Sequence, residues 1–172
     1  MSGSRARSCL AESDPQKGAP MREPGLELLF EATGALSPTV TIGNTAQGLE
    51  RVIPIPAGGP FEGPRIRGTM VGGYDWQLTR PDGVTVIDAL YLLETDDGVH
   101  LRCRNRGLRR GDPAVMQRLA AGEDVDADEY YFRCVPEFSA PAGRYGWLND
   151  SVFVSTGARY PDAIKVRFYQ LT

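Results

Sequence analysis

The chain has 172 residues, of which 41% are hydrophobic and 24% are charged, and its formal net charge is -3. A chain of this length buries roughly two-thirds of its unfolded surface and suits one globular domain. The acidic balance argues against a nucleic-acid or anionic-membrane binder, and no apolar run is long enough to span a bilayer. We therefore expect a cytoplasmic protein whose partner is a small molecule, and we leave a homodimer open.

The chain divides into a tail and one domain. Residues 1–24 are rich in Ser, Gly, Pro, Arg and Glu without a hydrophobic period, so we expect a flexible tail. Residues 25–172 form the expected single domain. Short apolar or alternating segments, separated by Pro and Gly, predict an all-β sandwich or barrel. The expected strands are 26–36, 39–43, 49–55, 64–71, 73–80, 85–95, 99–107, 129–138, 147–156 and 163–171.

One short helix is expected after the strand 99–107. Asp112 is a typical N-cap, Pro113 suits the first helical position, and residues 114–121 favour a helix that Gly122 ends. The apolar side chains of this helix lie in a narrow stripe. We expect that stripe to pack on the barrel, over one of its ends.

Two hairpins are predicted in the middle of the chain. Asp82-Gly83 and Asp97-Gly98 are dipeptides that two-residue hairpin turns prefer, because both central residues need a positive φ. Counting from such turns places Asp75 opposite Leu90 and Leu90 opposite Asn105, on one face of the sheet. The same count puts Tyr74, Tyr91 and Arg104 in a row on the other face and Gln77 opposite Asp88.

Asp75 is the strongest candidate for a catalytic residue. It lies mid-strand between Tyr74 and Trp76, where an aspartate has a poor intrinsic preference. If its face is the inner one, Leu90 desolvates the carboxyl group and the Asn105 amide offers one hydrogen bond. The pKa of Asp75 then rises, which suits a general acid or base. The alternative is an aspartate on a solvated outer face.

Other parts of the sheet pair a cation with an aromatic ring. Tyr131 and Arg133 share one face of the strand 129–138, where a neutral donor beside a cation stabilises an anionic oxygen; alternatively, the ring packs under the arginine. Arg104 lies beside Tyr91 in the counted register, either in a cationic wall that orients a carboxylate or enolate, or on a solvated outer face. We take Tyr131 and Arg133 as further candidate catalytic residues.

The predicted strand 147–156 begins with Trp147-Leu-Asn149. An aromatic ring and an amide two residues apart share a face of a strand, where they form either a core plug or the floor of a pocket. These side chains complete a set that we expect around a bound ligand. The candidate substrate-binding residues are Asn105, Leu90, Trp76, Arg104, Trp147 and Asn149.

The sequence predicts neither a metal site nor a cofactor. His100 is the single histidine, and Cys9, Cys103 and Cys134 have no metal-type spacing. A Walker loop, a dinucleotide fingerprint and a nucleophile elbow are not present in the sequence. We therefore expect chemistry without a cofactor. Cys103 and Cys134 are interpreted as buried free thiols of a reducing compartment.

Five ordered segments carry a resemblance to a known family. They are Gly73-Tyr-Asp-Trp-Gln, Asp88-Ala-Leu-Tyr-Leu-Leu-Glu-Thr-Asp-Asp-Gly, Arg104-Asn-Arg-Gly, Tyr130-Tyr-Phe-Arg and Trp147-Leu-Asn. From Leu26 to Leu171 the chain resembles domain of unknown function 3237, also called uncharacterised protein family 0311. The resemblance implies an antiparallel lipocalin-like (calycin-type) β-barrel, and no assigned activity.

One departure from the family pattern bears on the ligand. Family members more often read Asp-Ala-Arg-Tyr-Thr-Leu-Glu where this chain has Leu90 and Leu92 in place of the arginine and threonine. On the counted register both leucines lie on the face of Asp75. The change then removes an ion-pair partner of Asp75 and makes the cavity more apolar.

We expect a closed or nearly closed barrel of about eight strands, with room for side chains or one small ligand. The leading hypothesis is a cofactor-free isomerase, cyclase or lyase that acts on a small apolar oxygenated metabolite, in secondary metabolism. Asp75 moves the proton, while Arg133, Tyr131 and Asn105 hold the substrate oxygen. The rival is a non-catalytic carrier or sensor that uses the same pocket. A third reading is a structural module whose aromatic side chains fill the barrel.

Overall fold

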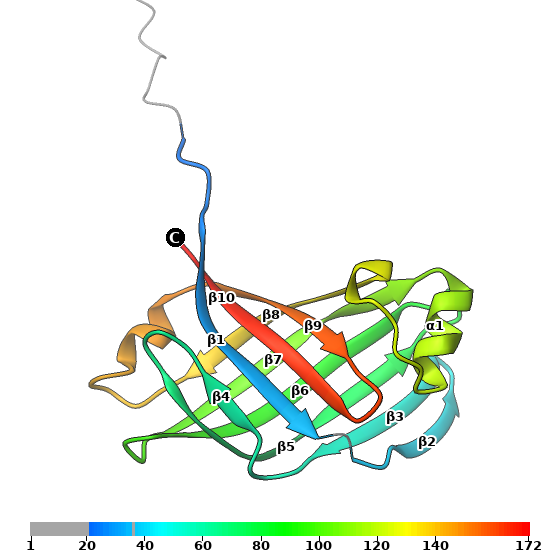
Figure 1. The fold of residues 1–172 in the computed structure, drawn as a ribbon, viewed down its shortest axis with the longest axis horizontal. Helices are drawn as coiled ribbons and strands as arrows, with labels where there is room; N and C mark the ends of the chain where they lie inside the picture. Colours follow the sequence, from blue (N-terminus) through cyan, green and yellow to red (C-terminus); the bar gives the residue numbers. More distant parts are fainter. Residues whose placement is uncertain (1–20, 36) are drawn as a thin grey trace, which may run out of the picture.

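The computed structural model describes residues 21–35 and 37–172, and these residues form ten strands in one antiparallel sheet (Figure 1). Residues 1–20, most of the predicted tail, lie outside the described part of the chain. The strands are β1 Leu26–Ala35, β2 Val40–Thr45, β3 Gly48–Ile55, β4 Pro60–Glu62, β5 Arg67–Thr79, β6 Thr85–Thr95, β7 His100–Gly111, β8 Tyr130–Ser139, β9 Phe153–Arg159 and β10 Ala163–Leu171.

The sheet closes on itself, so the predicted antiparallel β-barrel is confirmed. Strands β5 to β10 pair in chain order, β10 pairs with β1, and the short β4 joins β1 back to β5. This closed ring holds eight strands, β1 and β4 to β10. Strand β3 pairs with the second half of β5, and β2 pairs with β3. The hairpin of β2 and β3 thus extends the wall beyond the short β4.

The chain departs from the predicted strands at three places. The segments 64–71 and 73–80, predicted as two strands, are replaced by the single bulged strand β5 Arg67–Thr79, which bends at the bulge while keeping its partners. The short strand β4 was not predicted. Residues 147–150, predicted as strand, lie in a 3-10 helix, η2 Gly146–Asp150, and strand β9 begins only at Phe153.

Both predicted hairpins form, but each turn is one residue longer than expected. The Arg80 amide donates to the Val84 carbonyl and the Gly83 amide donates to the Arg80 carbonyl, so three residues form the β5–β6 loop. Gly83 has a φ of 82°, which is typical of a type I turn followed by one residue in the left-handed region. The β6–β7 turn repeats this geometry, with Gly98 at a φ of 80°.

The longer turns shift the predicted register by one residue in each hairpin. Asp75 lies opposite Ala89, and Ala89 lies opposite Asn105. Because the two shifts cancel over three strands, Asp75 and Asn105 share one face as predicted, but the prediction that Leu90 lies between them is wrong. Leu90 lies on the outer face, and Tyr91, predicted there, shares the inner face with Asp75.

The predicted helix is confirmed as α1 Pro113–Ala120 at one end of the barrel (Figure 1). The Asp112 carboxylate accepts from the Ala114 amide at 2.9 Å and so satisfies one of the free amides of the first turn. Leu119 is the buried side chain of this helix and packs with Ile87, Val125 and barrel residues below it. The helix covers this end of the barrel, as its apolar stripe predicts.

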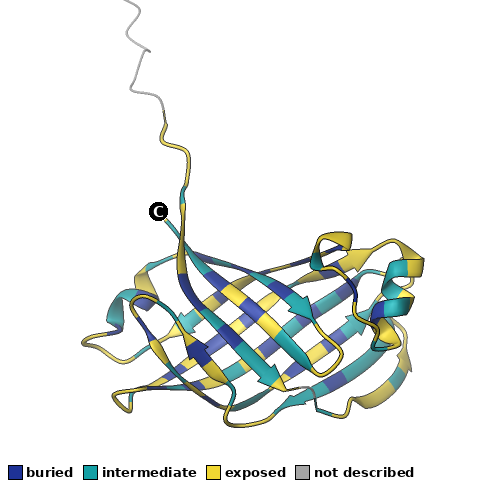
Figure 2. Cartoon of the chain, in the orientation of Figure 1, coloured by how far each residue is buried: buried dark blue, intermediate teal, exposed yellow. Residues whose placement is uncertain are grey.

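The opposite end of the barrel is filled with aromatic side chains. Phe30 is 1% exposed, and its ring centroid lies 4.5 Å from that of Phe168 and 5.0 Å from that of Phe61. Phe138 packs at the edge of the same group. Figure 2 shows the alternation of buried and exposed residues along the strands that produces this interior.

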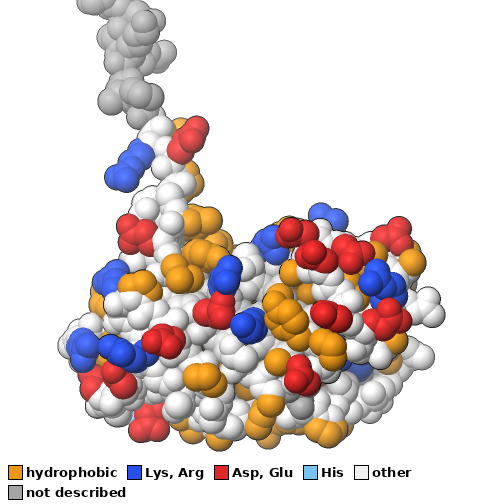
Figure 3. Space-filling view, in the orientation of Figure 1, with side chains coloured by type: hydrophobic (Ala, Val, Ile, Leu, Met, Phe, Trp, Pro, Cys, Tyr) orange, Lys and Arg blue, Asp and Glu red, His pale blue; other side chains and the backbone are white. Residues whose placement is uncertain are grey.

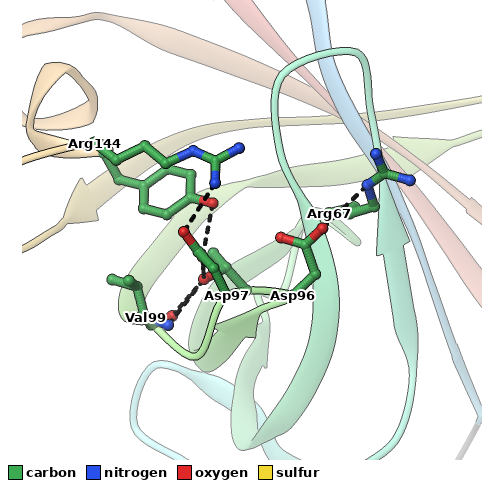
Figure 4. Close-up of polar contacts among 7 residues, drawn as sticks. Arg67, Asp96, Asp97, Val99 and Arg144 are labelled. Atoms are coloured by element: carbon green, nitrogen blue, oxygen red, sulfur yellow. Dashed lines mark hydrogen bonds and ion pairs between the residues drawn. The ribbon is translucent and has the colours of Figure 1, made fainter.

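A polar network closes this aromatic end. The Asp97 carboxylate in the β6–β7 turn accepts from the hydroxyl groups of Thr95 and Tyr145, at 2.6 and 2.9 Å, and from Arg144 at 2.9 Å (Figure 4). The hydrogen bond from Thr95 is the main reason why the pKa of Asp97 is lowered. The network ties the turn to the segment that leads into η2, so that Leu148 of η2 is buried against the core.

Charged side chains cover the outside of the barrel in pairs. Arg167 on β10 donates to Glu31 on β1 at 2.7 Å, and Arg106 on β7 donates to Glu137 on β8 at 3.0 Å. Figure 3 shows blue and red side chains intermingled with apolar ones over the viewed face. Exposed pairs of this kind contribute little stability, since water and salt screen them.

Candidate functional site

A cavity of about 110 Å³ lies inside the barrel, between the aromatic end and the end covered by α1. Its wall comes from the strands β1, β3, β5, β6, β7, β9 and β10 and from the segment that follows β1. An apolar cavity with a few convergent polar groups is the usual form of a small-molecule site. The apolar lining includes Phe30, Ile53, Ile55, Met70, Leu93, Ile164, Val166 and Phe168, and the polar lining includes Arg51, Asp75, Gln77, Tyr91, Arg109 and Arg159.

The Gln77 amide is the hub of the polar side of the cavity. Its Nε2 donates to Oδ2 of Asp75 at 2.6 Å. Its Oε1 accepts from Nη2 of Arg109 at 3.3 Å and from Nη2 of Arg51 at 3.4 Å. Gln77 is 2% exposed, so its amide is buried where it links one carboxyl group and two guanidinium groups. The network joins β3, β5 and β7, which are distant along the chain.

The Asp75 carboxyl group is buried and only half satisfied. The residue is 8% exposed, and among the described residues its Oδ1 has no hydrogen-bond partner. Desolvation raises the pKa of Asp75 to about 6, although the hydrogen bond from Gln77 and the charge of Arg109 act in the opposite direction. A carboxyl group with this pKa exchanges its proton near neutral pH, as the sequence interpretation of Asp75 requires.

Two arginines face Asp75 across the Gln77 amide. Arg109 is 7% exposed, and burial lowers the pKa of its guanidinium to about 10. Its guanidinium carbon lies 5.7 Å from the centre of the Phe132 ring. Among the described residues, the Nε atoms of Arg51 and Arg109 have no acceptor. Buried polar atoms without partners are costly, so these two atoms hold hydrogen-bonding capacity that the described residues do not use.

The predicted hydrogen bond from Asn105 to Asp75 does not form. Asn105 is buried but is not one of the residues that line the cavity, and its Oδ1 accepts from the Ser155 hydroxyl at 3.1 Å. Gln77 supplies the amide that reaches Asp75 instead. Tyr91 completes the inner wall, and burial followed by the charge of Asp75 raises the pKa of its phenol well above the usual range. Tyr91 is therefore a neutral hydrogen-bond donor at the cavity.

Three predicted site residues lie on the outer face of the barrel. Trp76 is 46% exposed because it alternates with the inward-facing Asp75 along β5, and Leu90 is 47% exposed because the corrected register turns it outward. Arg104 holds Asp88 through its Nε and Nη2 atoms at 2.8 and 2.7 Å. The prediction that Leu90 and its neighbour Leu92 make the cavity more apolar is therefore wrong, since both lie outside.

Tyr131 and Arg133 also lie outside and do not reach the cavity. The Arg133 guanidinium lies 5.4 Å from the centre of the Tyr131 ring, and that of Arg110 lies 4.9 Å from it. The Tyr131 ring therefore packs against arginine side chains, which was the alternative to a site for an anionic oxygen. The reason is the alternation along β8, in which Phe132 and Cys134 take the inward positions.

Trp147 and Asn149 lie in η2 rather than on a strand. The Asn149 side chain accepts from the Ala140 amide at 2.9 Å and donates to the Ala140 and Gly146 carbonyls, both at 3.0 Å. Trp147 packs against the core under the Arg65 guanidinium, at 3.7 Å. Both residues hold the loop at the aromatic end, and neither lines the cavity.

Sequence reasoning missed the three arginines of the cavity. The predicted strand stopped at Gly107, whereas β7 continues to Gly111 and so carries Arg109 inward on the face of Asn105. Arg51 lies opposite Gln77 on β3, and Arg159 ends β9. The alternation within β3 is the one signal that could have indicated Arg51, once Gln77 was assigned to the inner face.

Within the described part of the chain, no group of three or more His, Cys, Asp and Glu side chains is arranged to hold a metal ion. No helix in that part is long and apolar enough to cross a membrane. Cys103 and Cys134 are free thiols, both buried. Burial raises the pKa of the Cys134 thiol to about 12, so this thiol is not a ready nucleophile.

Replacing Gln77 with methionine, which has a similar volume, is expected to raise the pKa of Asp75 above about 6. The substitution removes the hydrogen bond that stabilises the charged carboxylate and leaves the desolvation in place. The carboxyl carbon resonance of Asp75, followed by NMR as a function of pH, measures the change. A lowered pKa would contradict this expectation and would show that Arg109 turns to pair with Asp75 directly.

The closed eight-stranded barrel with a partly polar cavity defines the class of this protein. The sequence profile described as "Protein of unknown function (DUF3237)" matches residues 24–171, and the chain belongs to this family. A curated relative, the UPF0311 protein blr7842 of Bradyrhizobium diazoefficiens, is 35% identical over 143 residues, which are 83% of this chain and 93% of the relative.

Solved structures share the fold. A β-barrel-like protein from Acinetobacter baumannii AYE has 35% identity and a TM-score of 0.77, over 90% of this chain and all of that chain. A structure described as an enzyme from Penicillium herquei has 20% identity and a TM-score of 0.67, over 90% of this chain and 99% of that chain. At 20% identity the likeness shows the fold alone.

Proposed function

We propose that the barrel binds a small, largely apolar molecule with an oxygen function and transfers a proton on it without a cofactor, as an isomerase, cyclase or lyase. The observation that carries the proposal is the Asp75 carboxyl group, which lines the cavity with an unpartnered Oδ1 and a pKa raised to about 6. A general acid or base works best when its pKa lies near the operating pH.

The rest of the polar wall supports the same chemistry. Proton removal from carbon beside a carbonyl group leaves negative charge on the carbonyl oxygen. The guanidinium groups of Arg51 and Arg109 lie beside Asp75 in a site with little water, where such charge is stabilised most strongly. These arginines take the role that the sequence assigned to Arg133 and Tyr131, which face outward.

The proposal also covers catalysis as such, the cellular location and the metabolic role. The fold neighbour from Penicillium herquei is described as an enzyme, which supports catalysis in a barrel of this kind. The free thiols of Cys103 and Cys134 support a reducing, cytoplasmic location, and a role in secondary metabolism is part of the proposal. The alternative is a carrier that uses the same cavity without turnover.

Hydrogen–deuterium exchange tests the proposal. A panel of small cyclic ketones and lactones in D₂O is followed by proton NMR, with and without the protein. We expect the wild-type protein to accelerate exchange at the carbon beside the carbonyl group of at least one compound. Asp75→Asn keeps the shape of the side chain but removes the proton carrier, so the acceleration falls by about 100-fold or more.

Asp88→Asn is the matched control, because Asp88 is a carboxylate of the same sheet that pairs with Arg104 on the outside. We expect it to keep the wild-type exchange rate. Exchange by Asp75→Asn at the wild-type rate would remove Asp75 from the mechanism. Ligand binding without exchange of any compound would favour the carrier.

A further inference from the structure

We infer that the cavity takes a carboxylate ligand, and that the Nε and Nη2 atoms of Arg51 and Arg109 hold its two oxygen atoms. The inference deepens the proposed function and rests on the same cavity, but it does not depend on turnover there. It assigns the chemical class of the ligand, which the fold and the family leave open.

The side chains that line the cavity carry more positive than negative charge. Three arginines, Arg51, Arg109 and Arg159, line it, and Asp75 is the one acidic side chain among the lining residues. Arg109 is nearly inaccessible to water, so solvent cannot screen its charge. Unbalanced buried charge is unfavourable, and a bound anion compensates it.

The arginines of the cavity have fewer hydrogen bonds than a comparable arginine on the outside of the barrel. On the outside of the barrel, Nε and Nη2 of Arg104 together bind both oxygen atoms of the Asp88 carboxylate, at 2.8 and 2.7 Å. Inside the barrel, the guanidinium edge formed by Nε and Nη2 has only part of its hydrogen bonds in Arg51 and in Arg109. The Nη2 atoms reach only a neutral amide oxygen, at 3.4 and 3.3 Å, and the Nε atoms have no acceptor among the described residues. A two-oxygen anion fits such an edge.

Asp75 does not fill this edge itself. Its Oδ2 accepts from the Gln77 amide nitrogen, and the two arginines donate to the oxygen of the same amide. Gln77 therefore separates the Asp75 carboxyl group from the two guanidinium groups. The protein thus carries a carboxyl group next to two guanidinium groups without a direct pair. This leaves the guanidinium edges for a carboxylate that comes from outside.

The apolar wall defines the rest of the ligand. Phe30 and Phe168 meet the cavity from the aromatic end, and Ile53 and Ile55 line it beside Arg51 on β3. A ligand that pairs its charge with the arginines therefore places an apolar body against these side chains. The class that fits is a small aromatic or alicyclic monocarboxylic acid.

Binding of such an anion is coupled to protonation of Asp75. A negative charge beside Asp75 disfavours its carboxylate, so the protein takes up a proton when the ligand binds. The charged and titratable groups that act on Asp75 are Arg51 on β3, Asp88 and Tyr91 on β6, Arg109 on β7 and Cys134 on β8. Tyr91 and Cys134 stay neutral near pH 7 because burial raises the pKa of each. Affinity is therefore expected to fall as the pH rises through about 6.

Calorimetric titration with benzoate and with its neutral analogue benzamide tests the inference. We expect benzoate to bind at least about tenfold more tightly, because only the anion uses the charged edges. Arg51→Gln and Arg109→Gln are each expected to weaken benzoate binding by about tenfold or more and to weaken benzamide binding much less, because the neutral amide forms no charged pair. Arg51→Lys keeps the charge but lacks the paired edge, so it is expected to restore only part of the affinity. Arg104→Gln, on the outer face, is the matched control and is expected to bind benzoate as the wild type does.

The proton is measured in the same experiment. Titrations in two buffers with different ionisation enthalpies give the number of protons taken up, which we expect to be greatest above the pKa of Asp75. In Asp75→Asn this uptake disappears, and so does the pH dependence of benzoate affinity between about pH 5 and pH 8. If Arg109→Gln does not fold, Arg51→Gln carries the test, because Arg51 is only half-buried.

The outcomes separate this inference from the proposed function. Benzoate that binds no better than benzamide, or that binds equally well to Arg51→Gln, overturns the carboxylate site even if the protein catalyses exchange on neutral compounds. Arginine-dependent benzoate binding without exchange on any compound supports the carboxylate site and overturns the proposed proton transfer.

Discussion

Replacing Asp75 with asparagine is expected to stabilise the folded protein above pH 6 by on the order of 3 kcal/mol, while it removes proton transfer. The pKa of the buried carboxyl group is raised from its ordinary value of 3.8 to about 6. The folded chain therefore binds this proton more tightly than the unfolded chain does. The stability that this contributes is fully present below about pH 3.8 and is lost as the pH rises through about 6. Above that pH the wild-type protein bears the full cost of a buried charge, which asparagine does not carry.

Urea unfolding of the wild type and of Asp75→Asn at about pH 4, 6 and 8 measures this effect. The difference in the free energy of unfolding is expected to be small at the lowest pH and to grow to a plateau. Asp88→Asn is the control of opposite sign, because the hydrogen bond from Arg104 lowers the pKa of Asp88. That variant should gain nothing at pH 8. Equal stability of Asp75→Asn and wild type at every pH would show that Asp75 ionises without cost.

Replacing Phe30 with alanine is expected to lower the free energy of unfolding by about 3–5 kcal/mol. Phe30 is 1% exposed and packs against Phe61, Phe138 and Phe168, so the substitution removes one ring from the centre of the aromatic cluster. The neighbouring strands β1 and β10 are fixed by their backbone hydrogen bonds and cannot close the space. Because Phe30 also lines the cavity, the cavity grows into the aromatic end.

Thermal and urea unfolding of Phe30→Ala measure the loss. Leu90→Ala is a suitable control, because Leu90 is a large apolar residue of the same barrel that lies 47% exposed on the outer face. A surface change of this kind is expected to alter stability by no more than about 0.5 kcal/mol. A loss below about 1 kcal/mol for Phe30→Ala would contradict the close packing of the aromatic end.

The local parts of this fold could be predicted from the sequence because they rest on local physical causes. Alternating polarity indicates β6, β7 and β8, and the side chains of Asp112 and Pro113 mark the start of α1. Asp75 was identified because a carboxyl group in the middle of a strand conflicts with its intrinsic preference. That conflict correctly indicated an unusual position, since Asp75 is buried and lines the cavity.

The choice of inner and outer face was decided by the tertiary structure. A side-chain period of two means that one extra residue in a turn exchanges the faces of everything beyond it. An Asp-Gly dipeptide fits both the two-residue turn and the longer loop that forms, so the sequence alone could not choose between them. The consequence is that Leu90, assigned to the inner face from a two-residue turn, lies outside the barrel, while Tyr91 takes an inner position.

The sequence by itself determined an all-β fold, one capped helix and the unusual mid-strand position of Asp75, because each depends on residues that are near one another in the chain. The tertiary structure alone decided which groups meet that acid. Arg51, Gln77 and Arg109 come together through the pairing of β3 with β5 and the closure of β5 through β6 onto β7. The reason is that a barrel interior is assembled from strands far apart in sequence, and the hydrogen bonds between those strands set which side chains face one another.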